Sequence, residues 1–377
     1  MPNWKKVIIS GSNAELSELK LTGLSSQESE NTTLVINGSG EVGTREDDDI
    51  NEVYRTGSSD NNIIPNKFGT FNNTGLNSAI ASGNNNKITS ACSFIGGGTL
   101  NTASAACTFI GGGSNNKIDN TFRSGSVIVG GKNNSTISGY YGPSFADTFI
   151  GGGFNNKIES YGGAFLGGGY LNTISGAYYN TIVGGQSNKI TGGYSFIGGG
   201  CNNSNSGYYT FIGGGVFNKI AGGGTYSSIV GGQRNTASAA CTFIGGGAKN
   251  IACGNYSSVV GGTLNTASAT LSFIGGGYQN SLLTSTVSAY DSGGSLISVT
   301  IGTGSVIVGG NLNTSSADNS FIGGGCNNKI PDGYREGSVI VGGTNNSTIS
   351  GYYPGPSFTN TFIGGGSNNK IEGWGGA

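Results

Sequence analysis

A short motif recurs seventeen times between residues 78 and 369, and it constrains the fold more than any other feature of the chain. The motif reads approximately Ser/Thr-Phe-Ile-Gly-Gly-Gly-x-x-Asn-x-Ile, and we call its central apolar residue the anchor. Glycine follows every anchor by three residues, and asparagine follows by six. A fixed period of this kind is typical of stacked supersecondary units, none of which buries its apolar face alone. The anchors are Ile80, Ile95, Ile110, Ile128, Ile150, Leu166, Ile182, Ile197, Ile212, Ile229, Ile244, Val259, Ile274, Ile307, Ile322, Ile340 and Ile363.

The commonest anchor spacing is 15 residues, which accommodates two short strands and two turns. Glycine numbers 75 of the 377 residues, and the apolar runs are short, β-branched or aromatic, as in strands. We therefore predict an all-β fold, a parallel β-roll or β-solenoid of about 17 coils stacked at about 4.8 Å. Each coil would contain one strand at the anchor, a glycine turn and a short strand at Asn-x-Ile. Such a rod is about 80 Å long.

The residues on either side of the anchor change together. Phenylalanine before the anchor always goes with glycine after it, whereas Val, Thr or Ser before the anchor goes with valine after it. These two positions face the same side of a strand, so the exchange conserves volume across one packed surface. The anchor points to the opposite side, and we expect both faces to be buried. A thin coil buries only one face inside itself, so the other predicts a homo-oligomer packed about an axis parallel to the rod.

The residues expected to form the core and the subunit contacts are Phe94, Phe109, Phe149, Phe165, Phe196, Phe211, Phe243, Phe273, Phe321, Phe362, Ile95, Ile110, Ile150, Ile197, Ile212, Ile244, Ile274, Ile322 and Ile363.

Glycine and lysine positions add two expectations. Glycine two and three residues after the anchor supplies a positive φ at a turn, or else allows close approach of neighbouring backbones.

Lysine directly after the asparagine occurs only in alternate coils, for example at Lys87, Lys117 and Lys157. Parallel stacking in sequence order explains this alternation, because lysines in adjacent coils would repel each other. The chain has 18 basic and 19 acidic residues, and thus no excess of positive charge that would attract a nucleic acid. We therefore expect no nucleic-acid partner.

The repeat resembles the head repeats of YadA-type trimeric adhesins, which are left-handed parallel β-rolls. The segments 101–104, 235–238 and 265–268, each Asn-Thr-Ala-Ser, fit that form best. The resemblance covers residues 78–377 and implies a homotrimer. The opening segment 1–12 and the segment 33–45 are similar to the start of tail-fibre proteins of marine bacteriophages.

Residues 1–77 differ in composition from the repeats, and they contain 17 of the 37 charged residues. We interpret them as an attachment or capping segment with a few strands, near Lys5–Ser10 and Leu34–Asn37, and a possible short helix at Ala14–Lys20. The alternative is a flexible polar leader. No apolar run has the length of a secretory h-region or of a membrane span, so we expect neither export by a signal peptide nor membrane insertion.

The chemistry available for catalysis is sparse. The chain contains no histidine, and the repeat region holds only eight carboxylates. Asp332 and Glu336 form the nearest candidate pair for glycan cleavage, but a solubilising role in one loop fits them better. The six cysteines follow the repeat, and we interpret them as free thiols, with a Cys92–Cys107 bridge as the alternative. We therefore expect no enzyme, cofactor or metal site.

The loops after the second strand vary in length and are rich in tyrosine. Such loops on a rigid scaffold suit contacts with a glycan or protein surface, although packing at the corners of the rod is an equal alternative. The largest insertion spans 281–304 and contains a candidate hairpin over Ser281–Tyr290 and Ser295–Gly302. The candidate receptor contacts are Tyr140, Tyr141, Phe145, Tyr208, Tyr209, Tyr352, Tyr353 and Phe358.

Together these features predict a non-enzymatic trimeric fibre or adhesin, best matched by a phage tail fibre. Residues 1–77 would attach it to the tail or baseplate, and residues 78–377 would form the β-solenoid that contacts a host surface. Such a protein assembles in the host cytoplasm and functions on the virion, outside the cell after release. The alternatives are a purely structural spacer, a bacterial surface adhesin and, less favoured, a glycan-degrading tailspike. We also expect further coils beyond Ala377, because residues 337–377 repeat 125–164 and end where the next phenylalanine is due.

Overall fold

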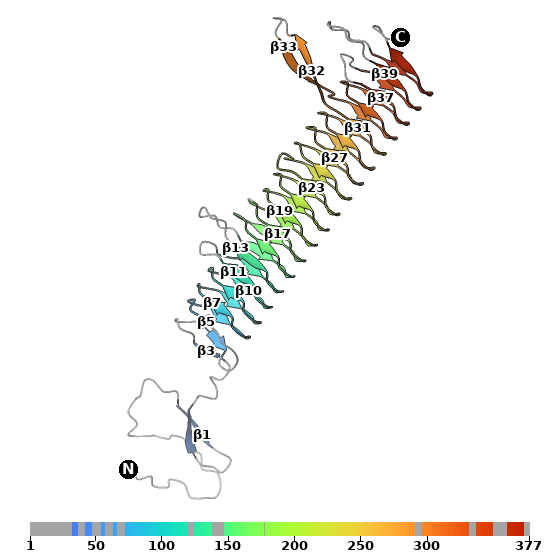
Figure 1. Cartoon of the computed structure of the whole chain (residues 1–377). Helices are drawn as coiled ribbons and strands as arrows, with labels where there is room; N and C mark the ends of the chain where they lie inside the picture. Colours follow the sequence, from blue (N-terminus) through green and yellow to red (C-terminus); the bar gives the residue numbers. More distant parts are fainter. Residues whose placement is uncertain are drawn as a thin grey trace, which may run out of the picture. The chain divides into compact units, whose positions relative to one another are not determined.

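A parallel β-solenoid of about 16 turns, with a period of about 15 residues, accounts for most of the structure (Figure 1). This computed structural model describes residues 32–36, 42–46, 54–56, 63–65, 72–119, 124–137, 147–176, 178–290, 296–331, 337–349 and 360–372. Those residues contain strands and turns but no helix, and hence no helix that could cross a bilayer. The predicted all-β fold and parallel stacking are confirmed.

The anchors lie in a first row of strands, in which each strand pairs in parallel with the strand of the next coil, as Phe94 does with Phe109. The row contains β6 (Ala79–Ile80), β8 (Phe94–Ile95), β10 (Phe109–Ile110), β12 (Val127–Ile128), β14 (Thr148–Ile150), β16 (Ala164–Leu166), β18 (Thr181–Ile182), β20 (Phe196–Ile197), β22 (Phe211–Ile212), β24 (Ser228–Ile229), β26 (Phe243–Ile244), β28 (Ser258–Val259), β30 (Phe273–Ile274), β34 (Val306–Ile307), β36 (Phe321–Ile322), β38 (Val339–Ile340) and β40 (Phe362–Ile363).

A second row begins seven residues after each anchor, at the predicted Asn-x-Ile strand, and it is also parallel. It contains β5 (Asn72–Asn73), β7 (Lys87–Ile88), β9 (Thr102–Ala103), β11 (Lys117–Asp119), β13 (Ser135–Ile137), β15 (Lys157–Ile158), β17 (Thr173–Ile174), β19 (Lys189–Ile190), β21 (Ser204–Asn205), β23 (Lys219–Ile220), β25 (Thr236–Ala237), β27 (Ile251–Ala252), β29 (Thr266–Ala267), β31 (Ser281–Leu282), β35 (Thr314–Ser315), β37 (Lys329–Ile330), β39 (Ser347–Ile349) and β41 (Lys370–Glu372).

Between the two rows runs a third line of contacts that the sequence analysis did not predict. The residue four positions after each anchor forms a single parallel bridge with its equivalent in the next coil, as Asn84 does with Thr99. The following residue adopts a left-handed conformation in every coil, and Leu100, with φ of 60°, donates its N–H to the Asn84 carbonyl at 3.0 Å. The turn is therefore hydrogen-bonded from coil to coil in the same way as the strands.

The interior of each coil is a small apolar core. Every anchor is fully buried except Ile363, which is 5% exposed at the last anchor strand. In most coils the second row contributes Ile, Ala or Leu beside it, for example Ile88 and Ala103, and in a few it contributes a buried polar side chain such as Thr136. Complete burial of one isoleucine side chain stabilises a fold by about 1.5–3 kcal/mol, and each coil adds such residues to one continuous column.

The asparagine six residues after each anchor forms a buried ladder. Asn188 is typical: its Nδ2 donates to the carbonyls of Gly184 and Gly200, both at 3.0 Å. Its Oδ1 accepts the backbone N–H of Asn203 at 3.0 Å. One amide therefore ties its own turn closed and links it to the next coil, which explains why this position does not change.

The glycine three residues after the anchor meets both conditions that the sequence analysis left open. Gly215 has φ of +91°, in the region that favours glycine, and a Cβ placed there would lie 2.1 Å from the Gly232 carbonyl oxygen. Turn geometry and close approach therefore both require glycine at this position.

The remaining strands lie outside the repeating coils. Residues 1–52 form a separate compact unit, in which β1 (Thr32–Ile36) pairs antiparallel with β2 (Val42–Glu46). In the second unit β3 (Tyr54–Thr56) pairs with β4 (Ile63–Pro65), which in turn pairs with β6 and extends the first row before residue 78. The expected strand at Lys5–Ser10 and helix at Ala14–Lys20 lie outside the described residues.

The largest insertion contains the predicted hairpin. Strand β32 (Ser285–Tyr290) pairs antiparallel with β33 (Leu296–Ile301), from Ser285 opposite Ile301 to Tyr290 opposite Leu296. Ser281 and Leu282 were expected in the hairpin, but they belong to the second row of the solenoid. Regular coil pairing therefore continues up to the hairpin.

The asparagine ladder predicts the effect of Asn188→Ala. Because the substitution leaves the Gly184 and Gly200 carbonyls and the Asn203 N–H without their partner, we expect a loss of about 3 kcal/mol in stability. Thermal unfolding followed by circular dichroism measures this. The control is Gln186→Ala, which removes an exposed amide from the same coil and should leave the melting temperature nearly unchanged. Equal melting temperatures for the two variants would contradict a structural role for the ladder.

Candidate functional site

An apolar band runs along the outer face of the first row. We define the apolar band as the side chains directly before and after the anchors, chiefly phenylalanine in some coils and valine in the others. Phe211 is 40% exposed and Val230 is 50% exposed. The expectation that both faces of this strand are buried therefore holds, within one chain, only for the anchor side. The other side lies open because the coil is too thin to cover it.

Glycine after the anchor in the phenylalanine coils has a geometric cause. A Cβ added at Gly213 would lie 2.3 Å from the carbonyl oxygen of Val230 in the next coil and 3.2 Å from the Cε1 atom of the Phe211 ring. A Cβ at Gly96 or Gly111 would likewise lie 2.5 or 2.3 Å from a carbonyl oxygen of the next coil, and 3.5 or 3.3 Å from the ring of its own coil. The backbone of the next coil, more than the ring, therefore excludes a side chain after the anchor in these coils.

The rings of the apolar band also stack along the rod. Phe196 and Phe211 have ring centroids 5.3 Å apart with an interplanar angle of 5°, and Phe149 and Phe165 are 5.1 Å apart with an angle of 1°. Stacked pairs of rings alternate with coils that expose a valine after the anchor, such as Val183 and Val230, so exposed apolar side chains recur along the first row. Soluble monomers seldom expose contiguous apolar areas beyond a few hundred Å², so a band of this length is typical of an interaction surface.

Glycine two residues after the anchor borders the apolar band. In five coils, for example at Gly152 and Gly199, a φ between +152° and +158° itself favours glycine, but in other coils nothing within one chain requires it. A Cβ added at Gly231, Gly246 or Gly261 would meet nothing within 4 Å, and none of these residues has a left-handed φ. Only the first coil has another residue there, Ser82. Since neither backbone conformation nor intrachain contact requires glycine at these three positions, close approach of a second backbone is the remaining physical reason for it.

The outer face of the second row is polar. Lys117, Lys157 and their equivalents alternate with serine and threonine, and register pairs Lys117 with Ser135 and Ser135 with Lys157. This confirms the stacking order inferred from the lysines. Two of these lysines pair with the carboxylate two residues later: Lys117 with Asp119 and Lys157 with Glu159, both at 2.6 Å.

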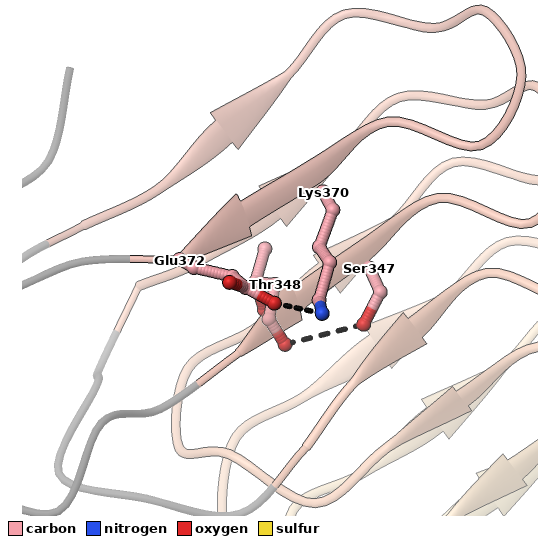
Figure 2. A network of polar contacts seen from close by, with 4 residues as sticks. All are labelled: Ser347, Thr348, Lys370 and Glu372. Atoms are coloured by element: carbon pink, nitrogen blue, oxygen red, sulfur yellow. Dashed lines mark hydrogen bonds and ion pairs between the residues drawn. The ribbon is translucent and has the colours of Figure 1, made fainter.

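Figure 2 shows the same arrangement in the last coil, where Lys370 and Glu372 form an ion pair beside Ser347 and Thr348 of the preceding strand. Such exposed pairs contribute at most about 1 kcal/mol each. Lysines are depleted from contacts between protein subunits. The lysine-bearing outer face of the second row is therefore less suited to such contacts than the apolar band is.

The candidate receptor contacts fall mostly outside the described residues. Tyr140, Tyr141, Phe145, Tyr352, Tyr353 and Phe358 lie there, as do Asp332 and Glu336. Tyr208 and Tyr209 are described, and they are 46% and 50% exposed. They lie at the turn that leads into β22. Tyr209 belongs to a longer row of tyrosines, which the sequence analysis missed, although the shared position three residues before the anchor is visible in the sequence.

The thiols lie on the surface or partly below it. Cys92 and Cys107 are exposed, while Cys201, Cys241, Cys253 and Cys326 are half-buried, and all six are free. Burial raises the pKa of the Cys253 thiol above its ordinary value, which disfavours the reactive thiolate. Among the described residues no group of three or more Cys, Asp or Glu side chains is placed to hold a metal ion.

Comparison with known proteins adds no relative: no family model matches the chain, and no curated protein is detectably similar to it. The functional argument therefore rests on the surfaces themselves.

The open glycines predict the effect of the triple variant Gly231→Ala/Gly246→Ala/Gly261→Ala. Each coil should keep its fold, because the added methyl groups point into open space. Self-association should weaken, because the same methyl groups would separate two closely packed backbones. Circular dichroism checks the fold and sedimentation velocity checks the association. Unchanged association would remove the argument that these glycines face a second chain.

Proposed function

We propose that the protein is a non-enzymatic fibre or adhesin in which copies of the chain pack side by side through the apolar band. The observation that carries the proposal is the apolar band with its adjoining glycines. Both features are explained by close packing of a second copy against the outer face of the first row. Burial of apolar area supplies the driving force, at roughly 25 cal/mol per Å².

The proposed assembly is a homotrimer about an axis parallel to the rod. The number three comes from the resemblance to YadA-type head repeats. A cyclic arrangement lets every copy bury its own band against its neighbours and leaves the polar second row outside, which suits the lysines found there.

The proposed role is attachment of a virion to its host, as a tail fibre. Residues 1–77 would join the rod to the phage tail, and the chain would assemble in the host cytoplasm. Each insertion follows a strand of the second row and precedes a strand of the first row, and loops on a rigid scaffold are the usual location of binding residues. The ligand would be a glycan or protein of the host surface.

Assembly is tested with Phe211→Asp. A carboxylate in the middle of the apolar band should prevent packing between copies, because a buried unpaired charge costs several kcal/mol, whereas in a free chain the side chain remains in water. Light scattering should give trimers for the wild type and smaller species for the variant. The control Tyr278→Thr replaces an exposed aromatic on another face with the residue found at the equivalent position, Thr263. A wild-type monomer in solution would refute the assembly.

Attachment is tested by deletion of the hairpin β32–β33 and of the insertions at 138–146 and 350–359. Virions that carry the shortened chain should adsorb to host cells several-fold more slowly, while the trimer persists. Equal adsorption by shortened and complete chains would favour a structural spacer instead.

A further inference from the structure

Four successive coils place an exposed tyrosine at the same corner, three residues before the anchor. We call Tyr179, Tyr194, Tyr209 and Tyr226 the tyrosine row. Their exposed fractions are 64%, 44%, 50% and 61%. Consecutive ring centroids are 5.4, 4.8 and 5.1 Å apart: the Tyr179 ring is tilted by 39° against Tyr194, whereas Tyr194, Tyr209 and Tyr226 stack with interplanar angles of 17° and 10°. Stacking occupies the ring faces and leaves the ring edges and the hydroxyl groups at the surface.

The backbone does not favour tyrosine at this corner. All four tyrosines are left-handed, with φ of 56°, 54°, 57° and 58°. A left-handed conformation costs roughly 1–2 kcal/mol for an ordinary residue, and Gly or Asn adopts it more easily. Other coils place Gly or Asn at the equivalent position, for example Gly304 and Asn319, but some place Cys or Leu there, as at Cys107 and Leu271. The corner therefore accepts several residue types, and the backbone alone does not account for tyrosine in four successive coils.

The tyrosine row lies on the edge of the rod that carries the insertions. Each tyrosine follows a strand of the second row and precedes a strand of the first row, and the hairpin β32–β33 leaves the solenoid at the same point of its coil (Figure 1). An edge that carries insertions of different lengths cannot pack flat against another copy. The row is therefore free for a different partner in the proposed assembly.

The same coils lack negative charge. No Asp or Glu occurs between Ser160 and Tyr290, where the charged residues are Lys189, Lys219, Arg234 and Lys249. Elsewhere in the second row, Lys117 and Lys157 pair with carboxylates.

Lys189 and Lys219 have Thr191 and Ala221 where those two lysines have their carboxylate partners. Both are exposed, and neither forms an ion pair within the described part of the chain.

The lysines and the tyrosine row occupy neighbouring positions of the same coils. Tyr194 follows Lys189 by five positions, so their backbones are at most about 18 Å apart. Thr191 lies between them, and its hydroxyl donates to the Ser206 hydroxyl of the next coil at 2.9 Å. These coils therefore offer exposed lysines, the paired hydroxyls of Thr191 and Ser206 and the phenols of the tyrosine row.

We propose that coils bearing the tyrosine row bind a linear acidic polysaccharide that lies along the rod. Its carboxylates would meet Lys189 and Lys219, and its sugar rings would contact the phenol edges and hydroxyls. An extended polymer gains one weak contact per coil, so affinity rises with the number of coils engaged. This inference rests on the proposed role in surface attachment, but places the contact on the flank of the rod rather than on its long loops.

The test measures binding of the assembled full chain to alginate, polygalacturonate and hyaluronate, with neutral dextran as the comparison, by isothermal titration calorimetry. Tyr194→Asn/Tyr209→Asn removes two rings but suits the left-handed backbone, so the fold should persist. We expect an affinity for the acidic polymer about tenfold or more below that of the wild type. The control Tyr278→Thr, which lies on another face, should bind like the wild type.

The lysines are tested separately with Lys189→Gln/Lys219→Gln. This variant should bind more weakly and depend less on salt, because two charge contacts are lost. Lys87→Gln, in the first coil, serves as its control.

Absence of binding to all three acidic polymers, equal binding of dextran, or unchanged affinity in Tyr194→Asn/Tyr209→Asn would overturn the inference. These outcomes are separate from the proposed function, since trimer formation and host adsorption are measured on the same variants. A trimer that adsorbs normally with the tyrosines removed refutes only the polysaccharide site.

Discussion

In-register stacking of the coils is the constraint on which the rest of the structure depends. A coil of about 15 residues has almost no internal hydrogen bonding between its strands, since strands as short as two residues pair with the coils before and after them. The buried asparagine strengthens this dependence, because Asn188 closes its own turn at Gly184 and simultaneously fixes Gly200 and Asn203 of the next coil. Stability is then a sum over neighbouring coils, as in other solenoids.

Stacking also converts single side chains into lines. A phenylalanine before the anchor becomes part of the apolar band, a lysine after the asparagine becomes part of a polar row, and a tyrosine at the corner becomes part of the tyrosine row. Each line occupies its own position around the coil. One rod therefore presents chemically different surfaces: an apolar one that we propose packs against other copies of the chain, and a phenolic one that we propose binds a ligand.

Much of the architecture could be predicted because the same local environment occurs in seventeen repeats, and the residues at each position can be compared from one repeat to the next. The coupled change of Phe94 with Gly96, against Val127 with Val129, identified the outward side of the strand. The alternating lysines identified the stacking order, which register then confirmed. Such internal comparison fails where a segment has no repeat, as in residues 1–77. It also did not predict Asn205, which is fully buried between Ile190 and Ile220 of the neighbouring coils and whose side-chain Nδ2 has no hydrogen-bond partner.

The sequence by itself determined the all-β class, the period, the parallel order of the coils and the apolar character of the strand at the anchor. These properties depend on periodicity and side-chain volume, which are local and repeat at fixed spacing. Only the tertiary structure decided what the invariant asparagine does, why Gly215 needs both its φ and its lack of a side chain, and that tyrosines from four coils form one row. Those answers depend on distances between residues of different coils, and a spacing in sequence becomes a distance in space only when the register of stacking is fixed.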